Sequence, residues 1–271
     1  TTETLFIALL VGGMLWLARA LDRRRLADFA GTGLLLGLAT LARPTTLFLP
    51  LALLPFLVWP WARAPRGWLV LTLVFALVQT PWVLRNAATF GRFEPTFTSR
   101  GYNLFMGTYP PTRGLSNLPA ERQPQDLLAS FGGKDEFEIN RLYAKAAMRN
   151  LREHPGGVAR LVLAKAVLCW FHTRPERNMF LPTPRSFAVN GPLLALGLAG
   201  VVLLRRRRAP HLLIPLGTIA FLVGMHLASV ATIRYNLPSM PFVILLAAAA
   251  GDRILAALLP GRRKTPVGSE A

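Results

Sequence analysis

Apolar residues along this chain are collected into blocks of membrane-span length, and polar residues fall between them. Four blocks lie in the first third of the chain, at residues 5–20, 29–42, 45–61 and 68–84. Three more lie near the other end, at residues 189–204, 212–230 and 242–259. About 20 apolar helical residues cross a bilayer core, and a shorter helix is accommodated by thinned membrane. The pattern predicts an all-α fold, a polytopic transmembrane helical bundle with seven spans.

One further apolar block, residues 158–171, is short and contains Lys165, with Arg160 near its start. Charged side chains at membrane depth cost roughly 2.5–3.5 kcal/mol each on insertion scales, so we expect this segment not to cross. The predicted organisation is therefore four transmembrane helices in 1–86, an extracytoplasmic loop in 87–156, a re-entrant or interfacial segment with an outer loop in 157–188, three transmembrane helices in 189–259 and a cytoplasmic tail in 260–271.

The long polar loop changes character at about Gly133. Before that point it has no clear periodicity, whereas from 136 to 153 apolar residues recur at helical spacing. These residues are Ile139, Leu142, Tyr143, Ala146 and Ala147, and a separate basic stripe is formed by Arg141, Lys145, Arg149 and Arg152. The pattern predicts an amphipathic helix that lies in the membrane interface. Packing of its apolar face on the protein itself is an equally good reading of the same residues.

The chain is strongly basic, with 31 Lys and Arg against 13 Asp and Glu and a formal net charge of +18. In a soluble protein such an excess points to nucleic acid, but the sequence has no zinc-ligand cluster, recognition-helix pattern or RNA-binding aromatic motif. Basic turns between membrane spans explain the excess, because such turns stay in the cytoplasm and attract anionic lipid. These turns contain Arg23 to Arg25, Arg63 with Arg66, and Arg205 to Arg208. The expected partner is anionic membrane lipid and not nucleic acid.

Metal and redox chemistry have no support in the sequence. Cys169 is the single cysteine, and the four histidines, at positions 154, 172, 211 and 226, have no metal-ligand spacing. We therefore identify no metal site and no cofactor, and assign no catalytic role to a histidine.

With the basic turns inside, the charged residues Glu3, Arg43, Arg85 and Arg234 all fall at the outer ends of their blocks. A single arginine at such a position is explained by snorkelling, in which the long side chain extends its charge to the membrane surface. Three on one face, beside a structured loop, predict an anion site, because the guanidinium fork matches phosphate oxygens. A lipid-linked phosphate lies at this depth.

Two loop segments add candidates for that site. Pro81 and Trp82 are expected to kink and anchor the end of a span, which brings Arg85 and Asn86 into the outer loop. Further on, a glycine-flanked segment at 101–107 carries aromatic rings suited to stacking on a sugar, although a turn packed on the membrane has the same composition.

Four stretches together resemble the polytopic glycosyltransferases of the C superfamily, in particular the bacterial relatives of protein mannosyltransferases and of the aminoarabinose transferase that modifies lipid A. They are TETLF at 2–6, GLLLGLATLARP at 33–44, PWVLRN at 81–86 with GRFEPTFTSRGYNLFMG at 91–107, and RYNLPSMPF at 234–242. Their order and spacing match the family over most of the chain.

The resemblance implies transfer of a sugar from a polyprenyl-phosphate donor to an acceptor at the outer membrane face, with inversion at the anomeric carbon. The family's general base is an aspartate in an early outer loop, which we expect upstream of Thr1, so the catalytic residue is unknown and the isolated chain is expected to be inactive. The candidate donor-binding residues are Arg43, Arg85, Asn86, Arg100, Tyr102, Asn103, Arg234 and Tyr235. The expected location is a bacterial inner membrane.

Two other functions stay open at this point. A transporter or flippase of lipid-linked glycans would also place arginines near an aqueous cavity, but the sequence has no inverted repeat and no carboxylate near the centre of a span. Asp252 comes closest, and Arg253 beside it suggests a local pair. A polysaccharide polymerase or ligase would share the lipid-phosphate substrate and the large outer loop.

Overall fold

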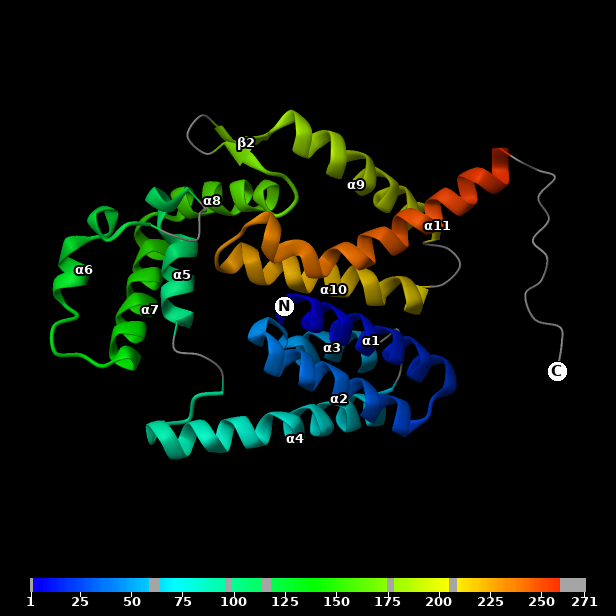
Figure 1. Ribbon diagram of the computed structural model, residues 1–271, viewed down its shortest axis with the longest axis horizontal. Coiled ribbons are helices and arrows are strands. Elements are labelled where there is room, and N and C mark those ends of the chain that lie inside the picture. Colours follow the sequence, from blue (N-terminus) through cyan, green and yellow to red (C-terminus); the bar gives the residue numbers. More distant parts are fainter. Residues whose placement is uncertain are drawn as a thin grey trace.

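The computed structural model describes residues 2–58, 64–95, 99–113, 118–174, 178–204 and 209–258, and nearly all of its elements are helices (Figure 1). The first group is α1 Thr2–Arg23, α2 Leu26–Ala42, η1 Pro44–Thr46, α3 Leu49–Val58 and α4 Pro65–Phe90. The loop region holds α5 Arg100–Thr108, η2 Pro110–Thr112, η3 Ala120–Arg122, α6 Gln125–Ala129, α7 Glu136–Glu153 and α8 Pro155–Leu168. The last group is α9 Pro184–Leu204, α10 Ala209–Ala228, η4 Ile233–Ser239 and α11 Met240–Leu258.

Four helical stretches are long and apolar enough to cross a membrane by themselves. They are α1, α4, α9 and the continuous stretch Ile233–Leu258, and three shorter apolar stretches accompany them, at Leu26–Ala42, Pro44–Pro55 and Leu212–Ala228. Each of the seven predicted blocks thus coincides with an apolar helical stretch. The prediction of an integral, multi-pass helical membrane protein is confirmed at this level.

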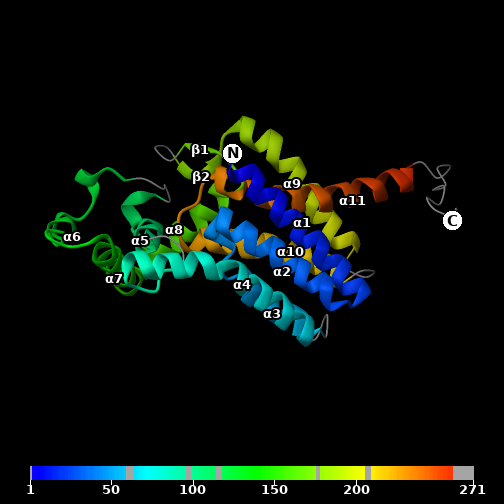
Figure 2. The same cartoon turned by 60° about the horizontal axis from the view of Figure 1, so that its bottom comes forward.

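The spans run in alternating directions, so that one end of the bundle collects particular helix ends. The beginning of α1, the ends of α2 and α4, and η4 all lie toward the end that carries α5, α6 and α7 (Figures 1 and 2). Sidedness relative to a membrane stays a prediction. Several of the basic residues from which the orientation is predicted lie outside the described residues. They are Arg63, Arg205 to Arg208 and the expected tail at 260–271.

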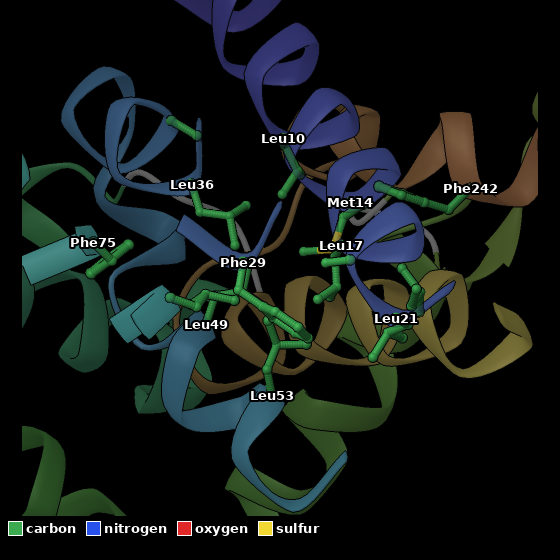
Figure 3. Packing of buried hydrophobic residues seen from close by; sticks show 14 of the residues in the cluster. Leu10, Met14, Leu17, Leu21, Phe29, Leu36, Leu49, Leu53, Phe75 and Phe242 are labelled. Carbon is green, nitrogen blue, oxygen red and sulfur yellow. The ribbon is translucent and has the colours of Figure 1, made fainter. Parts of the chain in front are cut away.

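Close packing of α1, α2 and α4 forms the main apolar core (Figure 3). Phe29 and Leu36 of α2 meet Leu10 and Leu17 of α1, and all four are almost completely buried. The Gly33-x-x-x-Gly37 spacing predicts close approach, and the structure confirms it. A Cβ on Gly33 would collide with the backbone carbonyl of Leu71 in α4.

Helix α10 joins the two groups of spans. It contacts α1 and α3 on one side and α8, α9 and α11 on the other, while α9 packs extensively on α11. The C-terminal end of α10 also contacts α5. The first group, the last group and the loop therefore meet around this end of α10.

The loop helix α7 forms at the predicted residues, and its apolar face packs against α5. Tyr143, Ala146 and Ala147 are buried there, which favours the reading in which the helix packs on its own protein. A capping box at Asp135 and Glu138 starts the helix, and the backbone N–H of Glu138, together with Arg92, holds the pKa of Asp135 below its usual value. The helix runs across the direction of the spans (Figure 1), and its place at the membrane interface stays a prediction.

A two-stranded antiparallel sheet is a departure from the all-α prediction. β1 Thr173–Arg174 pairs with β2 Asn178–Pro182 immediately after α8. The segment is too short and too rich in proline to show the alternation from which a strand is predicted. The hairpin returns the chain from the end of α8 to the start of α9.

Replacing Gly33 by alanine is expected to lower stability by about 1–3 kcal/mol, because α2 and α4 would have to separate to admit a methyl group. The measurement is the temperature at which the detergent-solubilised protein loses its monodisperse elution profile. Gly217→Ala in α10 is the matched control, since nothing lies within 4 Å of a Cβ there. Equal transition temperatures for the two variants would show that the α2–α4 contact is looser than described.

Single-cysteine labelling is expected to place α7 on the extracytoplasmic side of the membrane. Cys169 is buried, so Cys169→Ala provides a background for Lys145→Cys on α7 and for Arg25→Cys between α1 and α2. A membrane-impermeant maleimide should label the first site in intact cells and the second only after permeabilisation. The reverse labelling pattern would show that the orientation in the membrane is opposite to the predicted one.

Candidate functional site

A cavity of about 450 Å³ opens where the C-terminal end of α10 meets α1, the α2–η1 corner, α5 and η4. Most of its lining is apolar, and its polar side chains come from different segments. The lining residues are Phe6, Arg43, Pro44, Thr45, Leu47, Phe48, Arg100, Asn103, Leu104, Leu222, Met225, His226, Ala228, Ser229, Val230, Tyr235 and Pro238. Four of the eight predicted donor-binding residues, Arg43, Arg100, Asn103 and Tyr235, therefore share one cavity.

The end of α2 positions Arg43. Pro44 cannot continue the helix, and Arg43 adopts an extended conformation with φ −149° and ψ 119°. The hydroxyls of Thr40 and Thr46 lie 2.9 Å apart and are both buried, which closes the corner between α2 and η1. Arg43 is thereby held at the rim of the cavity.

Glu3 links Arg43 to Arg234 across the whole length of the chain. Its Oε1 lies 2.7 Å from Nε of Arg234 and 3.3 Å from Nη1 of Arg43. Arg234 does not line the cavity, but it directly precedes Tyr235, which does. One carboxylate thus sits between two guanidinium groups from the two ends of the chain.

Arg100 is held by a carboxylate of its own. Its guanidinium lies 2.6 Å from Oε1 of Glu94, which is buried, and the side-chain amide of Asn86 donates to the backbone carbonyl of Glu94 at 2.8 Å. Asn86, a predicted ligand, is buried itself and therefore orders the segment that holds Arg100. Sequence reasoning missed the role of Glu94, although its position six residues before Arg100 was visible.

His226 is a lining residue that the sequence did not single out. Its ring stacks on that of Tyr235, with centroids 5.5 Å apart and an interplanar angle of 18°. In the sequence His226 lies within the apolar block 212–230, whereas Tyr235 lies in the polar turn after it, so no periodicity relates the two residues. Together with Asn103 they give the cavity a polar and aromatic wall beside its arginines.

Four predicted ligands lie outside the cavity lining: Asn86 and Arg234, described above, and also Arg85 and Tyr102. The guanidinium of Arg85 stands 5.2 Å from the Trp82 ring and donates to Oδ1 of Asn86 at 3.0 Å. Tyr102 packs edge-on against Tyr143, with centroids 5.1 Å apart, in the cluster between α5 and α7. A ligand role for either residue stays a prediction.

A fully buried lysine holds together two of the helices that line the cavity. The ammonium of Lys165 in α8 donates to the backbone carbonyls of Gly107 and Ser229 at 2.9 Å each, and also to that of Leu227. These carbonyls end α5 and α10, where a cation is stabilised by the helix dipoles. The approach is so close that a Cβ on Gly107 would collide with the Ser229 carbonyl. Lys165 therefore fixes α5, with Arg100 and Asn103, against the end of α10.

Chemically, the cavity is suited to an amphiphilic anion. Guanidinium groups at its rim can bind phosphate oxygens, and the apolar wall formed by Phe6, Phe48 and Leu222 can cover a hydrocarbon chain. Within the described part of the chain, no group of three or more His, Cys, Asp or Glu side chains could hold a metal ion.

The fold defines an integral membrane protein of several spans, with a cavity lined by Arg43, Arg100 and mostly apolar residues at one end of the bundle. Residues 1–84, out of 271, match the sequence model of the family described as dolichyl-phosphate-mannose-protein mannosyltransferase. The matched part contains Glu3, Phe6, Arg43 and the α2–η1 corner. Searches of curated proteins and of solved structures each gave no match. The family consists of glycosyltransferases whose donor sugar is carried on a dolichyl or polyprenyl phosphate.

Replacing Lys165 by methionine is expected to lower stability by about 3 kcal/mol, because three carbonyls lose a charged hydrogen-bond donor. Lys145→Met on the exposed face of α7 is the matched control and should stay within about 0.5 kcal/mol of the wild type. Thermal unfolding in detergent measures both. A Lys165→Met variant as stable as the control would mean that the ammonium does not hold α5 to α10.

Proposed function

We propose that this chain forms the donor-binding part of a membrane glycosyltransferase that transfers a sugar from a polyprenyl-phosphate-linked donor to an acceptor at the outer face of a bacterial inner membrane. The observation that carries the proposal is the cavity, which combines guanidinium groups at its rim with an apolar wall. The family match over residues 1–84 supports it, because that segment supplies Arg43 and Glu3.

In this proposal the phosphate of the donor lies between Arg43 and Arg100, and its prenyl chain follows Phe6 and Phe48 toward the membrane. The sugar lies near Asn103 and Tyr235, where an amide and a ring face can contact hydroxyls and C–H groups. The predicted topology places Arg43, Arg100, Asn103 and Tyr235 on the outer side, and Phe6 and Phe48 lie near the outer ends of the predicted spans 5–20 and 45–61.

During transfer, the bond between the anomeric carbon and the phosphate oxygen breaks, and the acceptor oxygen bonds to that carbon from the opposite side. The lipid phosphate leaves with an additional negative charge, which the fixed arginines stabilise without reorganising. The acceptor proton passes to a carboxylate base, which the resemblance places upstream of Thr1. The residues of this chain then bind the donor and stabilise its leaving group.

A transporter or flippase would use the same cavity without chemistry, and a polymerase or ligase would use it with another acceptor. The family match favours transfer over transport. An assay that follows a radiolabelled sugar into an acceptor, in the presence of the upstream part of the protein, separates the three functions.

Arg43→Ala and Arg100→Ala are each expected to weaken binding of farnesyl phosphate about 10- to 100-fold, because each removes a charge-assisted pair with the phosphate. Native mass spectrometry of the detergent-solubilised chain gives the affinities. The matched control is Arg92→Ala, which removes an exposed arginine paired with Asp135 at 3.0 Å, away from the cavity. If both cavity variants bind as tightly as the control variant, the phosphate does not lie where we propose.

The chain without its expected upstream base should bind donor and transfer no sugar. Incubation with a polyprenyl-phosphate sugar and membrane acceptors measures this, with donor binding as the internal control. Glycosyl transfer by the chain alone would refute the proposed division of roles.

A further inference from the structure

Glu3 has an unusual place for a carboxylate in a site proposed to bind an anion. Its side chain is about one-fifth exposed and pairs with both Arg43 and Arg234, whereas the paired Arg234 side chain is 69% exposed. Glu3 does not line the cavity itself, but its carboxylate pairs directly with Arg43, which does, and lies between that guanidinium and the one of Arg234. A bound phosphate at Arg43 would share that guanidinium with Glu3.

The proposed reaction changes the charge of the lipid phosphate. A sugar-linked donor is a phosphodiester with one negative charge, and the spent lipid phosphate is a monoester with close to two, since the second pKa of a phosphate monoester is about 6. Arginines alone would bind the dianionic product more tightly than the monoanionic donor. A site built only from arginines would therefore retain its product.

We propose that Glu3 determines which phosphate the cavity prefers, by repelling the dianionic monoester more strongly than the monoanionic diester. This inference rests on the proposed function and adds a specificity residue to it. In a partly desolvated rim, repulsion between like charges is larger than in water and grows with the charge of the ligand. Glu3 would thus favour release of the spent lipid.

The other charged groups around the cavity do not take this role. Glu94 is buried against Arg100 at 2.6 Å, in a segment that Asn86 orders, so it sets the position of Arg100. Lys165 does not line the cavity and has three carbonyl partners, and His226 is stacked on Tyr235. Glu3 pairs with the lining residue Arg43, and replacing it by glutamine removes its charge while its size and a hydrogen-bond acceptor are preserved.

The test compares two ligands that share one prenyl chain, farnesyl phosphate and its methyl phosphodiester, at pH 8. Glu3→Gln is expected to raise the affinity for the monoester about tenfold and that for the diester about threefold or less, so that the monoester-to-diester affinity ratio rises at least threefold. Asp126→Asn is the matched control, because it removes one negative charge from an exposed loop residue, and its ratio should equal that of the wild type.

A second variant is expected to change the monoester-to-diester affinity ratio in the opposite direction. Arg234→Gln removes one of the two positive charges that offset the carboxylate of Glu3, so the ratio should fall below that of the wild type. Unfolding temperatures of both variants verify the fold, and the Arg234 variant carries the test if Glu3→Gln does not fold. An unchanged ratio in a folded variant overturns the role of Glu3. If the wild type binds neither ligand, the proposed function itself fails, and the two failures are thereby distinguished.

Discussion

The cavity depends on one carboxylate that joins the two ends of the chain. Glu3 begins α1, Arg43 follows α2 and Arg234 lies in η4, and the pairing of Glu3 with Arg234 spans 231 residues. Without it, the guanidinium groups of Arg43 and Arg234 would lose the carboxylate that lies between them, and the start of α1 would lose its ion pair with η4. The ion pairs therefore join the first and last groups of spans beside the cavity, and they offset part of the positive charge there. Structure and proposed binding depend on the same charges.

The loop becomes part of the site because a buried lysine holds it to the bundle. Lys165 satisfies the carbonyl ends of α5 and α10 together, and the apolar face of α7 covers α5 from the other side. Arg100 and Asn103 are thus presented by a helix that is fixed at its end and along its side. A glycosyl donor needs this kind of rigidity, since a catalytic arrangement that moves loses most of its effect.

Much of this could be predicted from the sequence, and the reasons for the rest are physical. The spans follow from apolar block length, the end of α2 follows from Arg43-Pro44, and close helix approach follows from Gly33 and its partner four residues on. Pairs between distant residues could not be predicted from the hydrophobic pattern, because no periodicity relates Glu3 to Arg234 or His226 to Tyr235. The sequence placed Arg85 among the ligands because it lies at the outer end of a predicted span, and Tyr102 because its ring could stack on a sugar. Which side chains these two residues contact, Trp82 and Tyr143, could not be predicted from the sequence.

The central claim is that the cavity holds a prenyl phosphate, and photo-crosslinking tests it most directly. A farnesyl phosphate that carries a terminal benzophenone should, on irradiation with the membrane-embedded chain, attach to the apolar wall at Phe48, Leu222 or Met225. The adducts should decrease in the presence of unlabelled farnesyl phosphate and be absent with the corresponding farnesyl alcohol probe. Adducts confined to the lipid-facing surfaces of α4 or α9, or equal labelling by the alcohol, would contradict the account.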